Sequence, residues 1–206
     1  MQLGWLELHL MNNPLRRIMQ RRFEGRQLLQ MGGVLPDTQV LEIGCGSGAG
    51  LDLIVNHFQV QRADGFDLDP AMLKVCTRRH HNNPKVNIWQ GNTRQIPTTD
   101  AVYDAVFDFG TLHHVRDWQA GVAEVFRVLK PGGRFFIEEI TRQFITHPLW
   151  RRVLDHPQEN RFDVYDLVKA LTACGFSVPQ YKQRFGLFIW AIADKPESGY
   201  NLGRPH

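Results

Sequence analysis

"LEIGCGSGAG", residues 41–50, alternates glycine with small residues directly after a short apolar run. The apolar run predicts a buried strand, and residues 51–58 have the apolar spacing of a helix. A glycine-rich turn between a strand and a helix lets the backbone approach a ligand and offers it unpaired amide groups. The spacing also satisfies the dinucleotide fingerprint, with Gly44, Gly46 and Ala49 at its three positions. The loop alone therefore fits either a pyrophosphate or the carboxylate of a nucleoside that carries an amino acid.

Composition sets broad limits on the class of protein. The chain has 206 residues, enough for one domain with a sizeable core, and its formal net charge of +3 does not by itself indicate nucleic-acid binding. Its three cysteines lie far apart with no zinc-ligand spacing, so we expect no metal site and a reducing compartment. The N-terminus lacks the charged region of a signal peptide, and no apolar run reaches the length of about 18 residues that a membrane span needs. These features predict a cytoplasmic location.

Residues 39–140 alternate short apolar strands with segments of helical period. Strands alternating with helices predict a parallel sheet with right-handed crossovers. Residues 130–133, "KPGG", are expected to end the last helix of this region, because proline cannot continue a helix and glycine permits a reversal. The expected strands are 40–44, 63–68, 86–91, 104–110 and 134–139, and the expected helices are 51–58, 70–80 and 118–129.

The segments on either side of this region have a different character. Residues 14–31 predict an arginine-rich amphipathic helix capped by Asn13, which either covers the sheet or forms a lid that touches the substrate or a membrane surface. Residues 163–175 predict a helix stopped by Gly175, and 176–195 predict an antiparallel hairpin that turns at Gly186. We therefore expect a single domain over 1–195, made of a helical lid (1–37), a cofactor-binding core (38–140) and a substrate cap with the edge hairpin (141–195), before a tail (196–206).

Two aspartates follow the second predicted strand in "GFDLDP", residues 65–70. Asp69 directly precedes Pro70, which suits the first position of a helix, so Asp69 is placed to cap that helix. Asp67 stands at the end of the strand, where a carboxylate can accept hydrogen bonds from a ribose diol. We therefore assign the cap to Asp69 and the ribose to Asp67.

Five blocks in one order extend this pattern: "VLEIGCGSGAG" (40–50), "GFDLDP" (65–70), "GNTRQIP" (91–97), "YDAVFDFGTLHHV" (103–115) and "RVLKPGGRFFIEE" (127–139). The series resembles the class I S-adenosylmethionine-dependent methyltransferases, above all the small-molecule group related to ubiquinone and menaquinone biosynthesis methyltransferases. The resemblance covers about residues 38–140, with a weaker similarity after 163. It implies a Rossmann-like three-layer α/β fold, with a seven-stranded, mostly parallel sheet that ends in an antiparallel hairpin. It also implies S-adenosylmethionine as the cofactor.

The resemblance further implies where the cofactor would bind. The glycine loop would lie along its methionine part and ribose, Asp67 would hold the ribose hydroxyls and Leu68 would lie along the adenine. Asn92 departs from the family, because an acidic residue often stands at this position next to the adenine. The full set of implied cofactor contacts is Glu42, Gly44, Cys45, Gly46, Gly48, Asp67, Leu68, Asn92, Thr93, Asp108, Phe109 and Gly110.

Methyl transfer places few demands on side chains. The sulfonium of the cofactor makes the methyl group electrophilic, and alignment of the acceptor can supply about 7–11 kcal/mol of the barrier, so no catalytic residue is obligatory. Histidine suits a general base, and His113 or His114 is the candidate for the acceptor side, although a structural role fits each equally well. Asp108, Glu138 and Glu139 are further candidates for the general base because of their positions near strand ends. Glu138 and Glu139 are consecutive, and side chains alternate along a strand, so at most one of these two glutamates can face the binding cleft.

These observations predict an enzyme that methylates oxygen, nitrogen or carbon of a small molecule. Aromatic and apolar residues in 142–150 favour a flat or apolar acceptor. An RNA or protein methyltransferase is the alternative, but the chain lacks the Asn/Asp-Pro-Pro-aromatic signature of amino-methylating nucleic-acid enzymes. A nicotinamide-dependent oxidoreductase would leave the "LKPGG" block and the hairpin unexplained. A cofactor-binding protein without turnover stays open, and so does the oligomeric state.

Overall fold

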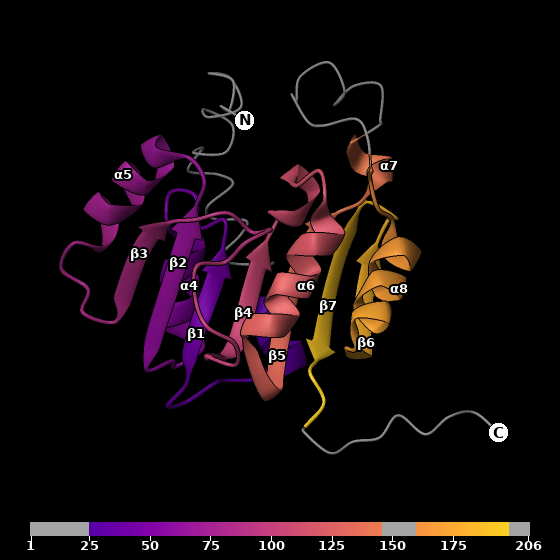
Figure 1. The fold of residues 1–206 in the computed structure, drawn as a ribbon, viewed down its shortest axis with the longest axis horizontal. Coiled ribbons are helices and arrows are strands. Elements are labelled where there is room, and N and C mark those ends of the chain that lie inside the picture. The colour runs from indigo at the N-terminus through magenta and orange to yellow at the C-terminus, as the bar shows by residue number, and fades with distance from the viewer. Residues whose placement is uncertain (1–24, 146–159, 198–206) are drawn as a thin grey trace.

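The centre of the structure, a computed structural model, is one sheet (Figure 1). Residues 25–145 and 160–197 are described. The strands are β1 (Gln39–Ile43), β2 (Arg62–Asp67), β3 (Val86–Gln90), β4 (Tyr103–Phe109), β5 (Leu129–Ile140), β6 (Ser177–Arg184) and β7 (Phe188–Asp194). They form a seven-stranded sheet in the order β3-β2-β1-β4-β5-β7-β6. β1 to β5 pair in parallel, whereas β7 pairs antiparallel with both β5 and β6. The predicted fold class and the terminal hairpin are confirmed.

Helices cover both faces of this sheet. They are α3 (Gly25–Gly32), α4 (Ala49–His57), α5 (Pro70–His80), the 3-10 turn η2 (Leu112–His114), α6 (Trp118–Val128), α7 (Arg142–Ile145) and α8 (Val164–Cys174). One buried cluster joins α3, α4 and α5 to the sheet, and a second joins α6 and α8 to its other face. None of the helices in the described ranges is long and apolar enough to cross a bilayer.

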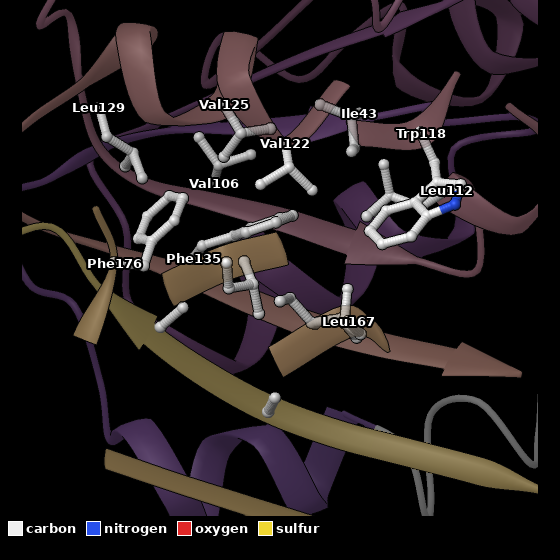
Figure 2. Packing of buried hydrophobic residues seen from close by; sticks show 14 of the residues in the cluster. Ile43, Val106, Leu112, Trp118, Val122, Val125, Leu129, Phe135, Leu167 and Phe176 are labelled. Carbon is white, nitrogen blue, oxygen red and sulfur yellow. The ribbon is translucent and has the colours of Figure 1, made fainter. Parts of the chain in front are cut away.

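The strands in the middle of the sheet are apolar along most of their length because both of their faces are covered. On β5, Phe135 belongs to the cluster under α6 and α8, whereas its neighbour Phe136 belongs to the cluster on the opposite face. Figure 2 shows Phe135 with Val106 of β4 and Val122 of α6 on one side and Leu167 of α8 on the other. The two layers pack the strands on both faces of the sheet, and the site lies at the carboxyl ends of these strands.

The "KPGG" stretch differs from the prediction. α6 ends at Val128, and residues 130–133 lie within β5 instead of forming a loop before it. Tyr103 pairs with Leu129 while Ala105 pairs with Arg134, so these residues form an irregular stretch opposite Asp104. Asp104 accepts a 2.7 Å hydrogen bond from Lys130 Nζ, and this ion pair keeps the stretch against β4.

Predictions from short-range chemistry agree with the structure. The side chain of Asp69 accepts a 2.8 Å hydrogen bond from the amide of Ala71 and caps α5, which begins at Pro70. Gly175 ends α8 in the left-handed conformation, with φ of 105°. Of the predicted helix over 14–31, only the part from residue 25 onward is described, as α3; Asn13, most of the predicted lid, the centre of the predicted cap and most of the tail lie outside the described residues. The division into lid, core and cap stays a prediction.

Candidate cofactor site

A cleft opens at the carboxyl ends of β1, β2 and β4. β1 lies between β2 and β4, so the chain crosses to opposite sides of the sheet at this point, which is where open α/β sheets bind ligands. The lining residues come from the strand ends, the glycine loop, the start of α5 and the segment around η2. They are Gly44, Gly46, Phe66, Asp67, Leu68, Asp69, Met72, Gly91, Asn92, Thr93, Phe109, Gly110, Thr111, His114 and Val115.

The predicted site residues divide into two groups. Those that line the cleft are Gly44, Gly46, Asp67, Leu68, Asn92, Thr93, Phe109, Gly110 and His114. Those placed behind its wall are Glu42, Cys45, Gly48, Asp108 and His113. Glu138 and Glu139 are both buried, and neither of them lines the cleft that the described residues form.

The glycines of the loop have different roles. Gly44, Gly46 and Gly48 all have positive φ, at 62°, 50° and 81°. A Cβ on Gly46 would meet no atom within 4 Å, so this backbone faces open space. A Cβ on Gly44 would overlap the side chain of Thr111, and one on Gly48 would lie 2.7 Å from the sulfur of Cys76. Gly46 therefore gives access to the cleft, whereas the other two allow close packing.

Asp67 is bound to the loop that it faces. Its Oδ2 accepts a 2.8 Å hydrogen bond from the amide of Gly46, and its Oδ1 accepts one of 2.8 Å from the amide of Asp69. Burial raises the pKa of Asp67, and these two amide donors act in the opposite direction. Each carboxylate oxygen keeps a second lone pair for a ligand. Leu68, the next residue, is 55% exposed and presents an apolar surface to the cleft.

Acidic side chains gather at the base of the cleft. Glu42 is buried, and its Oε2 has no hydrogen-bond partner. Burial raises the pKa of Glu42 well above its ordinary value, and the charges of Cys76, Asp67 and Asp108 raise it further. A cation bound nearby would relieve this repulsion. The electrostatics of the cleft therefore favour a ligand that carries positive charge.

A buried polar network lies next to the cleft. Nδ1 of His113 is 2.6 Å from Oε2 of Glu139, and the amide of His113 donates to Oε1 of the same carboxylate at 3.2 Å. Burial raises the pKa of Glu139 to about 7. Burial, followed by the neighbouring Glu139, also raises the pKa of Asp108. Nη1 of Arg161 donates to the carbonyl of His113 at 2.8 Å.

Several residues of this region were missed by the sequence analysis. Thr111 lines the cleft and donates its hydroxyl to the carbonyl of Ile43 at 3.0 Å, and Gly91 and Val115 also line it. All three residues fall within the motif blocks 91–97 and 103–115, so considering every position of each block could have found them. Arg161 had no such signal, because it lies 48 residues from His113 in the chain. Within the described ranges, no group of three His, Cys, Asp or Glu side chains could hold a metal ion.

Comparison with known proteins identifies the domain. Residues 41–137 match the model of the methyltransferase domain family. These residues form a class I S-adenosylmethionine-dependent methyltransferase domain. Its cofactor is S-adenosylmethionine.

Relatives with curated names support the same identification. A probable S-adenosylmethionine-dependent methyltransferase of Mycolicibacterium smegmatis is 36% identical over 140 residues, which are 68% of this chain and 52% of the relative. A fatty-acid O-methyltransferase of the same organism is 34% identical over 116 residues, which are 56% of this chain and 42% of the relative. The chain spans about half or less of the length of these two relatives.

Solved structures extend the likeness to most of the chain. The crystal structure of an S-adenosylmethionine-dependent methyltransferase from Aquifex aeolicus matches with a TM-score of 0.75 at 16% identity. The match covers 94% of this chain and 100% of that chain. At this identity the likeness shows the fold, which therefore extends beyond residues 41–137 of the methyltransferase domain.

The residues of the methyltransferase domain fit S-adenosylmethionine. A carboxylate with lone pairs to spare suits the ribose hydroxyls, and an exposed apolar side chain suits a flat base. The unpaired oxygen of Glu42 and the repulsion among the buried acids suit the positive charges of the ligand. The bare backbone at Gly46 leaves room for a group to approach closely.

Proposed function

We propose that this protein is an enzyme that transfers the methyl group of S-adenosylmethionine to a small, largely apolar molecule. The observation that carries the proposal is the cleft itself, where Asp67, the exposed Leu68 and the bare backbone of Gly46 face one space. A pocket that serves only to pack the fold would not need an acceptor carboxylate, an exposed leucine and a positive-φ glycine at one point.

Each cleft residue then has a role in cofactor binding. Asp67 accepts the ribose hydroxyls while it keeps its hydrogen bond to Gly46. Leu68 lies along the adenine, and Asn92 and Thr93 meet the adenine edge. Glu42, placed behind the cleft wall, offsets the positive charge of the methionine part through space. Phe109 and Gly110, at the end of β4, border the methyl group.

The side chains near η2 serve the acceptor. When bound, the cofactor supplies an electrophilic methyl group on a positively charged sulfur. The protein then has to hold the acceptor in line and keep water away. His114 is among the residues that line the cleft, so we assign acceptor contact to His114. His113 is buried against Glu139 and acts as a positioning residue for this segment.

The apolar character of the acceptor rests on two observations. Phe66, Met72, Phe109 and Val115 contribute apolar side chains to the cleft wall. The 34% identical relative is named for O-methylation of fatty acids, which combine a long apolar part with a small polar group. Both observations favour an apolar molecule over RNA or a protein segment as acceptor.

Two measurements test this proposal. Thermal unfolding is recorded with S-adenosylmethionine, S-adenosylhomocysteine and NAD, and we expect the first two to raise the melting temperature and NAD to leave it unchanged. Transfer of a labelled methyl group is then measured to fatty acids, fatty alcohols, phenols, quinols and tRNA. We expect label in one or more of the apolar small molecules. Stabilisation by NAD instead, label in tRNA alone, or binding without transfer to any acceptor would each reject the proposal.

A further inference from the structure

Two guanidinium nitrogens of Arg161 have no hydrogen-bond partner among the described residues. Its Nη1 donates to the carbonyl of His113, but Nε and Nη2 are buried and have no hydrogen-bond partner. Among the described residues Arg161 forms no ion pair. The chain is anchored at this point, because the adjacent Phe162 is buried with its ring 4.7 Å from that of Trp118.

This arrangement is costly unless an anion completes it. Arg161 is only partly buried as a residue, but its Nε and Nη2 are shielded from water, and donors that lose water without gaining a partner destabilise the folded state. Burial lowers the pKa of Arg161, and the negative charge of Glu139 raises it. The carboxylate of Glu139 is already engaged, since Oε2 lies 2.6 Å from Nδ1 of His113 and accepts the amide of Ile140 at 3.1 Å. The described residues therefore supply no acceptor for Nε and Nη2 of Arg161.

The two free nitrogens form one edge of the guanidinium plane. Nε and Nη2 point their N–H bonds in parallel, and this edge matches the two oxygens of a carboxylate. The third nitrogen, Nη1, is held by the carbonyl of His113 and so orients the plane. The residue that follows this carbonyl is His114, which lines the cleft. Arg161 is therefore adjacent to the segment that carries His114, although it is not itself among the residues that line the cleft.

We propose that Arg161 binds the carboxylate of the methyl acceptor, which makes the acceptor a small carboxylic acid with an apolar remainder and the product its methyl ester. The proposal rests on the proposed function, because it names the acceptor of the same reaction. It assigns a specificity-determining role to a residue outside every motif block of the sequence.

The chemistry balances without a base. One carboxylate oxygen attacks the methyl carbon, so a carbon–oxygen bond forms while the carbon–sulfur bond breaks and its electron pair goes to sulfur. The negative charge of the carboxylate and the positive charge of the sulfonium cancel, and no proton is released. A carboxylate offers about four lone-pair directions, so the two hydrogen bonds from Arg161 leave about two, one of which can attack the methyl group. A buried His113 held by Glu139 is compatible with this reaction, which needs no proton acceptor.

Binding of matched ligands tests the proposal independently of turnover. Dodecanoate and dodecan-1-ol have the same chain length and differ in the charged group, so their dissociation constants are compared by calorimetry on protein saturated with S-adenosylhomocysteine. The variants are Arg161→Gln, Arg161→Lys and, as a matched control, Arg116→Gln, which removes an exposed arginine near the same segment. The KM and kcat for labelled methyl transfer to dodecanoate are measured in parallel.

We expect wild-type protein to bind dodecanoate more tightly than the alcohol. Arg161→Gln is expected to weaken dodecanoate binding about tenfold or more, as for the loss of a charge-assisted pair of hydrogen bonds, and to leave the affinity for the alcohol unchanged. Arg161→Lys is expected to fall between the two, because lysine keeps the charge but lacks the planar edge. Arg116→Gln is expected to behave as wild type.

Other results would overturn the inference. Wild-type protein that prefers the alcohol, an Arg161→Gln variant with unchanged dodecanoate affinity, or an Arg161→Lys variant equal to wild type would each reject Arg161 as the carboxylate site. An unchanged melting-temperature shift with S-adenosylhomocysteine shows that a variant is folded with its cofactor site intact. Methyl transfer confined to neutral acceptors would reject this inference and leave the proposed function standing, whereas transfer to no acceptor would reject the proposed function.

Discussion

The carboxylate of Asp67 holds the amide of Gly46, with 2.8 Å between Oδ2 and the amide nitrogen. This bond ties the end of β2 to the middle of the glycine loop that follows β1. One side chain therefore shapes the loop and faces the cleft at the same time. The neighbouring Asp69 has a local task, the cap of α5. The two aspartates differ in role although one residue separates them.

Replacing each of these aspartates separates cofactor binding from stability. We expect Asp67→Ala to abolish the rise in melting temperature that S-adenosylhomocysteine causes, because both the ribose acceptor and the support of Gly46 are lost. Asp69→Ala is expected to lower the free energy of unfolding by about 1 kcal/mol, as for a lost helix cap, and to keep the ligand-induced shift. Differential scanning fluorimetry with and without ligand checks both. If S-adenosylhomocysteine raised the melting temperature of Asp67→Ala as much as that of the wild type, the ribose role of Asp67 would be wrong.

The open space at Gly46 gives a second prediction. Alanine at φ of 50° costs about 1–2 kcal/mol, and its Cβ would project into the cleft. Gly46→Ala should therefore fold with reduced stability and bind S-adenosylhomocysteine more weakly, by about tenfold if the methyl group removes one close contact of about 1.4 kcal/mol.

Gly33→Ala is the matched control for this substitution. Gly33 also has positive φ, at 74°, and a Cβ there would meet no atom within 4 Å, but it lies outside the cleft. We expect a similar loss of stability with unchanged ligand affinity in titration calorimetry. Equal affinities in the two variants would show that Gly46 does not contact the ligand.

The buried Glu139 predicts a pH dependence of stability. Its pKa is raised from 4.5 to about 7, so the folded protein favours the protonated form more than the unfolded chain does. The contribution of Glu139 to stability is therefore complete below about pH 4.5 and is lost as the pH rises towards 7. Glu139→Gln should flatten this part of the curve of unfolding free energy against pH, as measured by urea unfolding.

Glu124 provides a control of opposite sign. Its hydrogen bonds with Arg127 lower its pKa, so its contribution is present above the ordinary pKa of 4.5 and is lost as the pH falls. Glu124→Gln should reduce the loss of stability in acid and leave the region between pH 5 and 7 nearly unchanged, by the same linkage. A wild-type slope in Glu139→Gln over that region would contradict the prediction.

A core substitution tests what holds the strand ends in place. The ring of Phe107 is fully buried, and its centroid lies 4.6 Å from that of Phe136 and 4.9 Å from that of Phe58. Phe107→Ala should cost about 3–5 kcal/mol of unfolding free energy. Phe185 is 79% exposed, so Phe185→Ala should change stability by no more than about 0.5 kcal/mol. Urea unfolding measures both, and a loss below 1 kcal/mol for Phe107→Ala would show that the core does not depend on this ring.

Much of the fold could be predicted because its causes are local. The cap at Asp69, the stop at Gly175 and the alternation of strands and helices depend on residues a few positions apart, and the structure agrees with each. The "KPGG" stretch shows where local rules fail. Proline and glycine do end α6 nearby, but pairing with β4 and the ion pair between Lys130 and Asp104 keep residues 130–133 within β5. That pairing joins segments about 26 residues apart, which no local rule describes.

The candidate site also has features that the sequence predicts and features that only the tertiary structure decides. The residues themselves place glycines and an aspartate at strand ends, because a close backbone approach and a ribose acceptor each require a particular residue type next to a strand. Folding assigns the tasks among them: Gly46 faces the cleft while Gly48 packs against Cys76, and His114 lines the cleft while His113 turns to Glu139. Arg161 reaches the carbonyl of His113 only in the folded chain. These choices depend on which distant side chain occupies the adjoining space, and close packing settles that only when the layers come together.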